Sequence, residues 1–276
     1  MAEQACKGGQ SDRVALVLGG GSAGEGWSNG QASAVQLAVD GYHVVVADRS
    51  EAAARQSCDL IHARGGAAIA VTCNVGDTRQ LVDAIGAAHG WRGRLDALLF
   101  NVGLSGSGAG LDAYGEDEWD RAFAVNARAA FTAYRTCVPL MRENGFGRLI
   151  AITSIAAKLT SGRRPNHAYA ASKAALTTLT RSVAVEVGQY GITANCVVPG
   201  MIDTPHASLA IRRSRPPEEA EAMLAKRALL SPTNSQGSPW DIARAVAFVA
   251  HPDNGYVNGT EIVVDGGVTN LMPAMA

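Results

Sequence analysis

Short apolar runs rich in β-branched residues alternate with longer segments of helical periodicity along this chain. The runs are VALVL at 14–18, HVVVA at 43–47, AAIAVTC at 67–73, LDALLF at 95–100, RLIAIT at 148–153, ITANCVV at 192–198 and a last strand at 261–265. The helical segments are 31–40, 51–64, 77–89, 116–143, 166–189 and 239–250. Strands that are apolar on both faces are typical of a parallel sheet covered by helices. The alternation predicts an α/β fold in a single domain: a doubly wound, Rossmann-type parallel sheet with helices on both faces and right-handed crossovers.

Composition excludes several classes of partner. The chain has 276 residues, and its 24 basic and 25 acidic side chains give a net charge of -1, so we expect no nucleic-acid partner. The polar start MAEQACKGGQSDR and the lack of a run of about 18–20 apolar residues predict a cytoplasmic protein without membrane association. The cysteines lack any Cys-x-x-Cys or Cys/His spacing, which predicts reduced thiols and no metal site. They are Cys6, Cys58, Cys73, Cys137 and Cys196.

Ligands of doubly wound sheets bind beyond the carboxyl ends of the strands, so the residues after each run are the candidates for a site. The glycine-rich stretch GGGSAGEGWSNG, 19–30, follows the first strand and precedes a helix. Its backbone amides and the positive end of the helix dipole suit a diphosphate. Asp48 ends the second strand, where its carboxylate can accept hydrogen bonds from both ribose hydroxyls of an adenosine. Together these features predict a dinucleotide cofactor.

The kind of dinucleotide depends on Asp48. Its carboxylate would repel a 2′-phosphate, which favours NAD over NADP. Arg49 keeps NADP open as the less favoured alternative, because a guanidinium can hold such a phosphate. Asn74 and Val75, after the third strand, are placed to border the adenine ring. Further candidates at this edge, after the fourth strand, are Asn101, Val102 and Gly103.

A reacting group follows the fifth strand. Ser154 ends that strand, and Tyr169 and Lys173 lie one helical turn apart in YAASK, so both project from one helix face. The pKa of a tyrosine is about 10, and an adjacent ammonium lowers it, more so beside an oxidised nicotinamide. The phenol can then exchange a proton with a substrate hydroxyl that Ser154 also hydrogen-bonds, while the cofactor takes a hydride.

These motifs together resemble the short-chain dehydrogenase/reductase family over nearly all of the chain, from Arg13 to Gly267. They are the glycine-rich turn, Asp48, FNVG at 100–103, Asn126 in FAVNARAAF, Ser154 in ITS, YAASK at 169–173, VVPGMIDT at 197–204 and GTEIVVDGG at 259–267. The resemblance implies that Tyr169 is the general acid/base and that Lys173 binds the nicotinamide ribose. It implies that Ser154 orients the substrate and that Asn126 supports a water relay. It also implies that the nicotinamide end is held by Pro199, Gly200, Ile202 and Thr204.

The strand ends depart from the family pattern at two places. The family usually has two asparagines before the alanine and glycine of its fourth-strand motif, whereas this chain has Phe100, Asn101, Val102 and Gly103. Asn74 stands where an aspartate is usual. We expect an amide contact to the adenine at that position.

The glycine-rich turn is the third departure. The family spaces its glycines as G-x-x-x-G-x-G, and counting from Gly19 puts Ala23 and Glu25 where glycines belong. Counting back from the helix makes Gly30 the last glycine and implies five extra residues, and a literal match of the spacing falls at Gly20, Gly24 and Gly26. We expect an enlarged turn in which EGWSN, 25–29, bulges outward. The residues expected to approach the cofactor are Gly19, Gly20, Ser22 and Gly24.

The stretch at about 204–237 is expected to be a substrate flap over the nicotinamide. Its arginines at 212, 213 and 215 suit either a solvated helix face or a clamp on an anionic substrate. The same two alternatives apply to Arg163 and Arg164, in the loop before Tyr169. An apolar pocket for an alicyclic or aromatic alcohol is the alternative, lined by Leu104, Ile155, Met201, Leu209 and Met223. We expect the oxidoreductase domain to span 13–270, between a flexible N-terminal tail at 1–12 and a C-terminal tail at 271–276.

The resulting hypothesis is an NAD(H)-dependent oxidoreductase that interconverts a secondary alcohol and a ketone. One alternative is a dihydrodiol or ring dehydrogenase that uses the same site. Another is a dinucleotide-binding sensor without catalysis. We expect apolar faces of the helices at 116–143 and 166–189 to pair subunits into a homotetramer or homodimer.

Overall fold

The strands form one parallel sheet at the centre of the computed structural model, which describes residues 12–160, 166–213 and 215–271. They are β1 (Val14–Leu18), β2 (His43–Asp48), β3 (Ala68–Thr72), β4 (Ala97–Phe100), β5 (Gly147–Ile152), β6 (Ile192–Pro199) and β7 (Glu261–Val264). Their order is β3-β2-β1-β4-β5-β6-β7, and each neighbouring pair is parallel. The predicted doubly wound sheet is confirmed.

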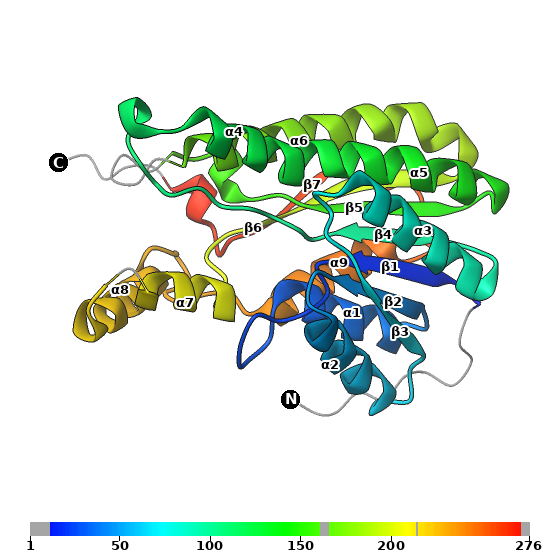
Figure 1. Ribbon diagram of the computed structural model, residues 1–276, viewed down its shortest axis with the longest axis horizontal. Coiled ribbons are helices and arrows are strands. Elements are labelled where there is room, and N and C mark those ends of the chain that lie inside the picture. Colours follow the sequence, from blue (N-terminus) through cyan, green and yellow to red (C-terminus); the bar gives the residue numbers. More distant parts are fainter. Residues whose placement is uncertain (1–11, 161–165, 214, 272–276) are drawn as a thin grey trace.

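Helices cover both faces of this sheet (Figure 1). One face carries α1 (Asn29–Val39), α2 (Glu51–His62) and α9 (Pro239–Ala250), and the other carries α3 (Thr78–Arg92), α4 (Glu116–Phe123), α5 (Ala129–Glu143) and α6 (His167–Val187). Successive strand side chains alternate between two cores: Leu16 and Leu18 pack under α3, α5 and α6, whereas Val17 packs under α1, α2 and α9. Because both faces are buried, every position of β1 is apolar.

The strand order reverses around β1, which pairs with β2 on one side and with β4 on the other. Ligands of such sheets bind at this reversal, beyond the carboxyl ends of the strands. Backbone hydrogen bonds join the ends of β1, β2 and β4 at this reversal. The amides of Gly19 and Gly20 donate to the carbonyl oxygen of Ala47, at 2.8 and 3.2 Å, and the amide of Asn101 donates to that of Leu18.

The segment 116–143 is helical throughout but is not one α-helix. A π-helical segment, Ala124–Arg128, separates α4 from α5. Such segments are rare and frequently occur at functional sites. Asn126 lies within this one and is fully buried. The prediction of a single regular helix over 116–143 is therefore wrong at its middle.

The predicted flap leaves and rejoins the sheet at one point. The amide of Asp203 donates to the carbonyl oxygen of Gly237 at 2.8 Å, and the amide of Gly237 donates to that of Met201 at 3.0 Å. Between these residues lie α7 (Pro205–Arg213) and α8 (Pro217–Leu229), which project beyond the end of the sheet in Figure 1. The flap therefore has two helices of its own.

Some expectations concern residues that the structure does not describe. The tail at 1–12 is described only at Asp12, and the tail at 271–276 only at Leu271. Cys6, Arg163 and Arg164 also lie outside the described residues. Among the described helices, none has the length and apolar character to cross a bilayer.

Candidate functional site

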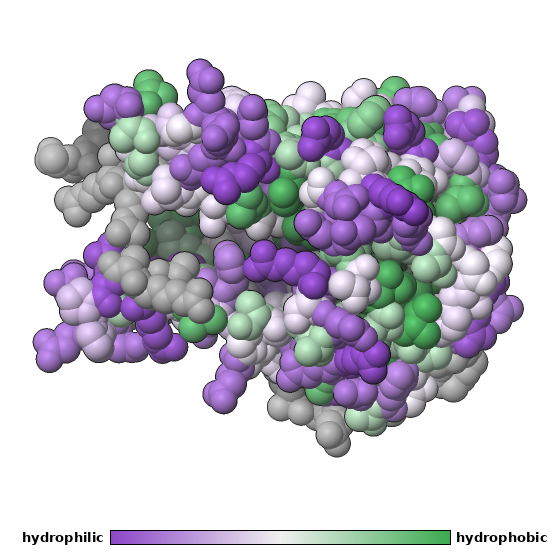
Figure 2. Space-filling view, viewed as in Figure 1, coloured by the Kyte–Doolittle hydropathy of each residue, from purple (hydrophilic) through white to green (hydrophobic). Residues whose placement is uncertain are grey.

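A cleft of about 530 Å³ opens beyond the carboxyl ends of β4, β5 and β6, and the flap forms one of its walls. Figure 2 shows this face of the molecule hollowed between the flap and the helical layer that contains α4 and α6. Many residues predicted from the sequence meet in this cleft. They are Asn101, Gly103, Ser154, Tyr169, Lys173, Pro199, Gly200, Ile202 and Thr204.

Helix α6 presents Tyr169 and Lys173 to the cleft from successive turns. The ammonium of Lys173 donates to the carbonyl oxygens of Val102 and Ile152, at 3.1 and 2.8 Å, and lies 5.9 Å from the centroid of the Tyr169 ring. Lys173 is only 2% exposed. A Cβ at position 103 would lie 3.3 Å from Nζ of Lys173 and 3.7 Å from the Tyr169 ring. Glycine at 103 thus lets the loop after β4 pack directly on this pair.

Burial dominates the titration of the pair. It raises the pKa of the Tyr169 phenol, while a side-chain hydrogen bond with Ser154 acts in the opposite direction. It also lowers the pKa of Lys173 to about 7. The net direction of the Tyr169 pKa in the protein chain is therefore upward, and the tuning of Tyr169 by Lys173 stays a prediction. The amine is directed at two carbonyl oxygens, and burial disfavours its own charged form.

Asn126 connects the loop after β4 to α6. Its Oδ1 accepts from the amide of Leu104 at 2.7 Å, and its Nδ2 donates to the carbonyl oxygen of Leu104 and to Oγ of Ser172, at 3.0 and 2.9 Å. Ser172 in turn donates to the carbonyl oxygen of Tyr169 at 3.0 Å. Asn126 thus positions the backbone beside Tyr169, and its part in a water relay stays a prediction.

The register of the glycine-rich loop is visible at Gly30. A Cβ there would lie 2.0 Å from the carbonyl oxygen of Gly19 and 2.5 Å from Nδ2 of Asn101. Nδ2 of Asn101 donates to that same oxygen at 2.8 Å. The start of α1 therefore packs on the start of the loop because position 30 has no side chain. This geometry agrees with counting the glycines back from the helix.

The outward bulge consists of residues 23–26 rather than the expected 25–29. Residues 23–26 are exposed, and Gly24 faces the flap, since a Cβ on it would lie 3.3 Å from Cδ1 of Leu209. Ser22 closes the bulge by hydrogen bonding to the carbonyl oxygens at 24 and 26, at 3.2 and 3.0 Å. Trp27 instead packs on Trp240 of α9, with ring centroids 4.8 Å apart. The expectation that EGWSN bulges as a unit is wrong from Trp27 onward.

Asp48 holds the loop from the side of β2. Its Oδ2 accepts from the amide of Gly21 and its Oδ1 from the amide of Ser50, both at 3.0 Å. A Cβ at Gly21 would lie 2.9 Å from Oδ2, so the close approach requires glycine. The sequence motif does not single out Gly21. Each carboxylate oxygen can still accept a further hydrogen bond, as ribose hydroxyls would require.

The two residues expected at an adenine ring differ in exposure. Asn74 is exposed, and its Oδ1 accepts from the amide of Gly76 at 3.1 Å. Val75 is 8% exposed and its side chain belongs to the core under α3. The side chain of Val75 is therefore not available to an adenine ring, and a contact there would involve its backbone.

The end of β6 is tightly packed on neighbouring strands. A Cβ at Gly200 would lie 2.6 Å from Cα of Asp265, so glycine lets the chain turn past β7. Ile202 is 5% exposed and forms a bridge to Gly237. Oγ1 of Thr204 accepts from the amide of Ala207 at 3.3 Å, at the start of α7.

Ser28 and Asn29 of the cleft lie at the end of the glycine-rich stretch but are not among the residues expected at the cofactor. The cleft residues Ser105, His206, Ile211 and Arg227 belong to no motif. Oδ1 of Asn29, at the first position of α1, is buried and has no hydrogen-bond partner among the described residues. Ser28 caps α1, since its Oγ accepts from the amide of Gln31 at 3.0 Å. A serine before a helical segment signals such a cap and could have directed attention here. No local signal places His206 or Arg227, because both depend on how the flap packs.

None of the arginines at 212, 213 and 215 is among the described residues that line the cleft. Arg212 is paired with Glu221 at 3.0 Å, and Arg215 with Glu219 at 3.9 Å. The solvated helix face therefore fits Arg212, whose side chain is 54% exposed. Arg215 is only 20% exposed, and its Nε is buried without a hydrogen-bond partner among the described residues, so it does not fit that account. The side chain of Arg213 is not described. The apolar candidates at 104, 155, 201, 209 and 223 do not line the cleft either. Its apolar wall contains Ile152, Ile202 and Ile211.

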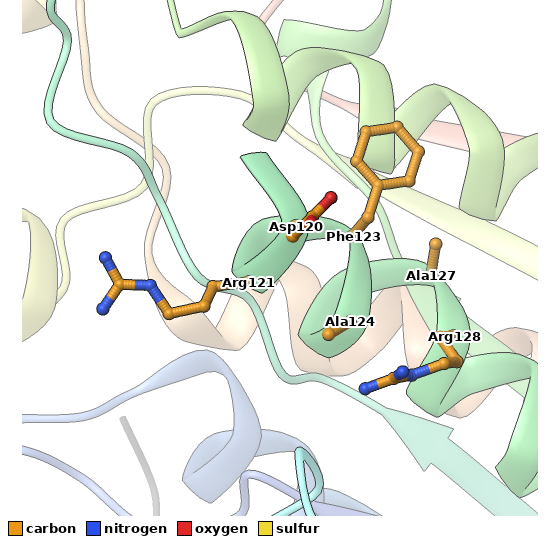
Figure 3. A pocket seen from close by; sticks show the side chains of 6 residues that line it. All are labelled: Asp120, Arg121, Phe123, Ala124, Ala127 and Arg128. Carbon is orange, nitrogen blue, oxygen red and sulfur yellow. The ribbon is translucent and has the colours of Figure 1, made fainter. Parts of the chain in front are cut away.

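A second concavity, of about 510 Å³, lies on the surface of α4 and the π-helical segment. In Figure 3, Phe123 extends to one side of this helix and Arg128 to another. Phe123 also stacks on Trp119, with centroids 4.9 Å apart. This concavity contains none of the predicted site residues, so it is not the candidate active site.

The cleft fits a dinucleotide by its own geometry. Gly21 and Gly30 do not line the cleft, but a Cβ on either would collide with Asp48 or with the loop backbone, so the glycine-rich loop packs closely on the start of α1. Ser28 and Asn29, at that start, line the cleft. The unpartnered oxygen of Asn29 points to a polar ligand at the start of α1. No aspartate or glutamate is among the described residues that line the cleft, as an anionic diphosphate requires. The fold and this cleft define an α/β protein of the dinucleotide-binding class.

Comparisons with known proteins agree with this assignment to a dinucleotide-binding class. A family model described as enoyl-(acyl carrier protein) reductase matches residues 23–269. Short-chain reductase protein NovJ of Streptomyces niveus is 33% identical over 256 residues, 93% of this chain and 94% of that protein. The crystal structure of levodione reductase has a TM-score of 0.88 at 29% identity, covering 95% of this chain and 100% of that one. The crystal structure of a point variant of actinorhodin polyketide ketoreductase with NADPH has a TM-score of 0.86 at 26% identity, covering 95% and 100%.

The chain belongs to the short-chain dehydrogenase/reductase family. Members of this family are oxidoreductases that bind a nicotinamide dinucleotide.

Proposed function

We propose that this protein is an NAD(H)-dependent oxidoreductase that interconverts a secondary alcohol and a ketone, with Tyr169 as general acid/base. The observation that carries the proposal is the cleft in which Tyr169, Ser154 and Lys173 meet beside the flap. A polyketide ketoreductase of similar structure is in line with carbonyl chemistry at such a site.

A bound nicotinamide supplies the carbon that accepts or returns a hydride and, when oxidised, a positive charge. In alcohol oxidation, Ser154 and Tyr169 hold the substrate hydroxyl, and Tyr169 takes its proton as the carbon loses the hydride. In ketone reduction, Tyr169 returns the proton to the carbonyl oxygen. Burial favours the neutral phenol, so Tyr169 is ready as an acid and needs added positive charge to act as a base. Lys173 is held where such charge would act on it.

NAD is proposed over NADP because the Asp48 carboxylate, which accepts a hydrogen bond from the glycine-rich loop at Gly21, would repel a 2′-phosphate on an adenosine ribose bound there. The ketoreductase structure with NADPH makes NADP the alternative for this chain. Asp48→Asn should raise the NADP to NAD ratio of kcat/KM about tenfold, since charges about 4 Å apart at a protein surface interact by roughly 1–4 kcal/mol. Saturation kinetics with both cofactors measures that ratio. A wild-type enzyme that prefers NADP, or a ratio that Asp48→Asn leaves unchanged, contradicts the assignment.

The function itself is tested with a panel of alicyclic, aromatic and dihydrodiol substrates, followed by NADH absorbance and product identification. Ketone products support the proposal. Aromatised or unsaturated ring products support the dihydrodiol or ring dehydrogenase instead. Tight NADH binding with no oxidation of any substrate supports a sensor.

Two predictions from the sequence remain proposals. We propose a homotetramer or homodimer, which the exposed apolar side chains of Trp119, Phe131 and Val185 on α4, α5 and α6 favour. Light scattering coupled to gel filtration measures the assembly. Cytoplasmic localisation also remains a proposal.

A further inference from the structure

We infer that Arg227, on flap helix α8, binds a carboxylate of the substrate, so that the preferred substrates are hydroxy acids and their keto acids. This inference rests on the proposed alcohol–ketone reaction and names its substrate class. The basic cluster that the sequence offers for such a role, 212–215, lies elsewhere on the flap.

Arg227 lines the same cleft as Tyr169 and Ser154. Its Nε donates to Oε1 of Gln236 at 3.0 Å, which fixes one edge of the guanidinium. Within the described residues, neither terminal nitrogen of Arg227 forms a hydrogen bond. A guanidinium that is anchored at Nε and open at its terminal nitrogens is suited to hydrogen-bond a carboxylate.

Charge in the cleft favours an anion. The basic residues in its lining are Lys173, His206 and Arg227, and the described lining contains no acidic residue. No carboxylate of the described chain pairs with Arg227, whereas Arg212 and Arg215 of the same flap are both paired. The exposed Asp203 acts on Arg227 only at longer range, and burial lowers the pKa of Arg227. A partly buried cation without a counter-ion is costly, and an anionic ligand would offset that cost.

Position in the cleft connects this charge to the reaction. A substrate carboxylate on Arg227 keeps the rest of the molecule in the cleft that Ser154 and Tyr169 also line, together with the apolar side chains of Ile202 and Ile211. In the oxidation, the substrate carbon loses a hydride to NAD and its hydroxyl loses a proton to Tyr169. The carboxylate is unchanged throughout, so Arg227 acts in specificity and not in the chemical step.

Calorimetric titration of the NADH-saturated enzyme tests the inference without turnover. The probes are butyrate, hexanoate and benzoate, each compared with its neutral amide. We expect at least one carboxylate to bind the wild type tenfold or more tightly than its amide, by about the strength of one charged hydrogen bond. Arg227→Gln should abolish that difference. Arg212→Gln, which removes a surface arginine of the same flap, should preserve it.

Several outcomes overturn the inference. They are equal affinity of the wild type for carboxylates and amides, no carboxylate binding at all, and a preference that persists in Arg227→Gln. The comparison of carboxylates with their amides on the wild type tests the inference even if a variant fails to fold. If Arg227→Gln weakens NADH binding as much as carboxylate binding, the side chain serves the cofactor diphosphate, which also overturns the inference.

The alcohol panel separates this inference from the proposed function. If hydroxy acids are oxidised no better than neutral alcohols of similar size, and Arg227→Gln does not lower kcat/KM for the hydroxy acids, the proposed function stays intact and the substrate class is removed. Carboxylate binding that depends on Arg227, without oxidation of any hydroxy acid, removes the proposed function instead.

Discussion

The two walls of the cleft are held in place by different parts of the chain. On the α6 wall, Lys173 is 2% exposed and its amine is fixed by carbonyl oxygens at the ends of β4 and β5. On the outer surface of the flap wall, away from the cleft, Arg212 and Glu221 pair with each other at side-chain exposures of 54% and 63%. The first wall is fixed by the core of the domain and the second mainly by its own two helices. A family with this arrangement can change its substrate at the flap while the reacting group stays in position.

The largest expected effect falls on the α6 wall. Lys173→Met should lower kcat/KM on the order of a thousandfold, because it removes the amine held beside Tyr169 and leaves the carbonyl oxygens of Val102 and Ile152 without that donor. Steady-state kinetics with an alcohol from the panel measures the loss. If kcat/KM is retained, the amine that the core holds on the α6 wall is not needed for the reaction.

The same variant should also change how the free energy of unfolding depends on pH, which can be measured without an activity assay. The pKa of Lys173 is about 7 in the folded protein and near 10.5 when unperturbed. Between these values the unfolded chain binds more protons, so raising the pH stabilises the folded state, by up to about 1.4 kcal/mol per pH unit. The free energy of unfolding of the wild type relative to Lys173→Met should therefore rise from pH 7 to pH 10. Urea denaturation measures it, and a constant difference would show that Lys173 stays protonated in the fold.

Next in size is the glycine that brings α1 onto the loop. Gly30→Ala should reduce the free energy of unfolding by about 3 kcal/mol, since its Cβ would lie 2.0 Å from the carbonyl oxygen of Gly19. Gly86→Ala on exposed α3 is the matched control, because a Cβ there meets nothing within 4 Å. It should stabilise by about 1 kcal/mol through helix propensity. Similar values for the two variants would refute the register assigned to Gly30.

The pattern of apolar runs was sufficient to predict the sheet, because strands buried on both faces must be apolar at every position. The strand ends also predicted most of the cleft, since parallel strands bring their carboxyl ends to one edge. Other features depend on contacts distant in sequence. The loop register is set by the approach of Gly30 to Gly19, and the pKa direction of Tyr169 by burial. The place of Arg227 depends on the packing of α8.

The smallest expected effect lies on the flap surface. Arg212→Gln should change the free energy of unfolding by less than about 0.5 kcal/mol, because exposed ion pairs contribute little. Thermal or urea denaturation checks this. A loss several times larger would mean that the flap is held by its surface ion pairs, and the contrast between the walls would disappear.

The central claim is that one phenol in this cleft transfers the substrate proton. Tyr169→Phe tests it most directly, because it removes the hydroxyl and preserves the ring that packs on Gly103. We predict a fall in kcat of about 10²–10⁴-fold, as for loss of a general acid or base, with NADH binding nearly unchanged. A variant that turns over alcohol at the wild-type rate would contradict the account.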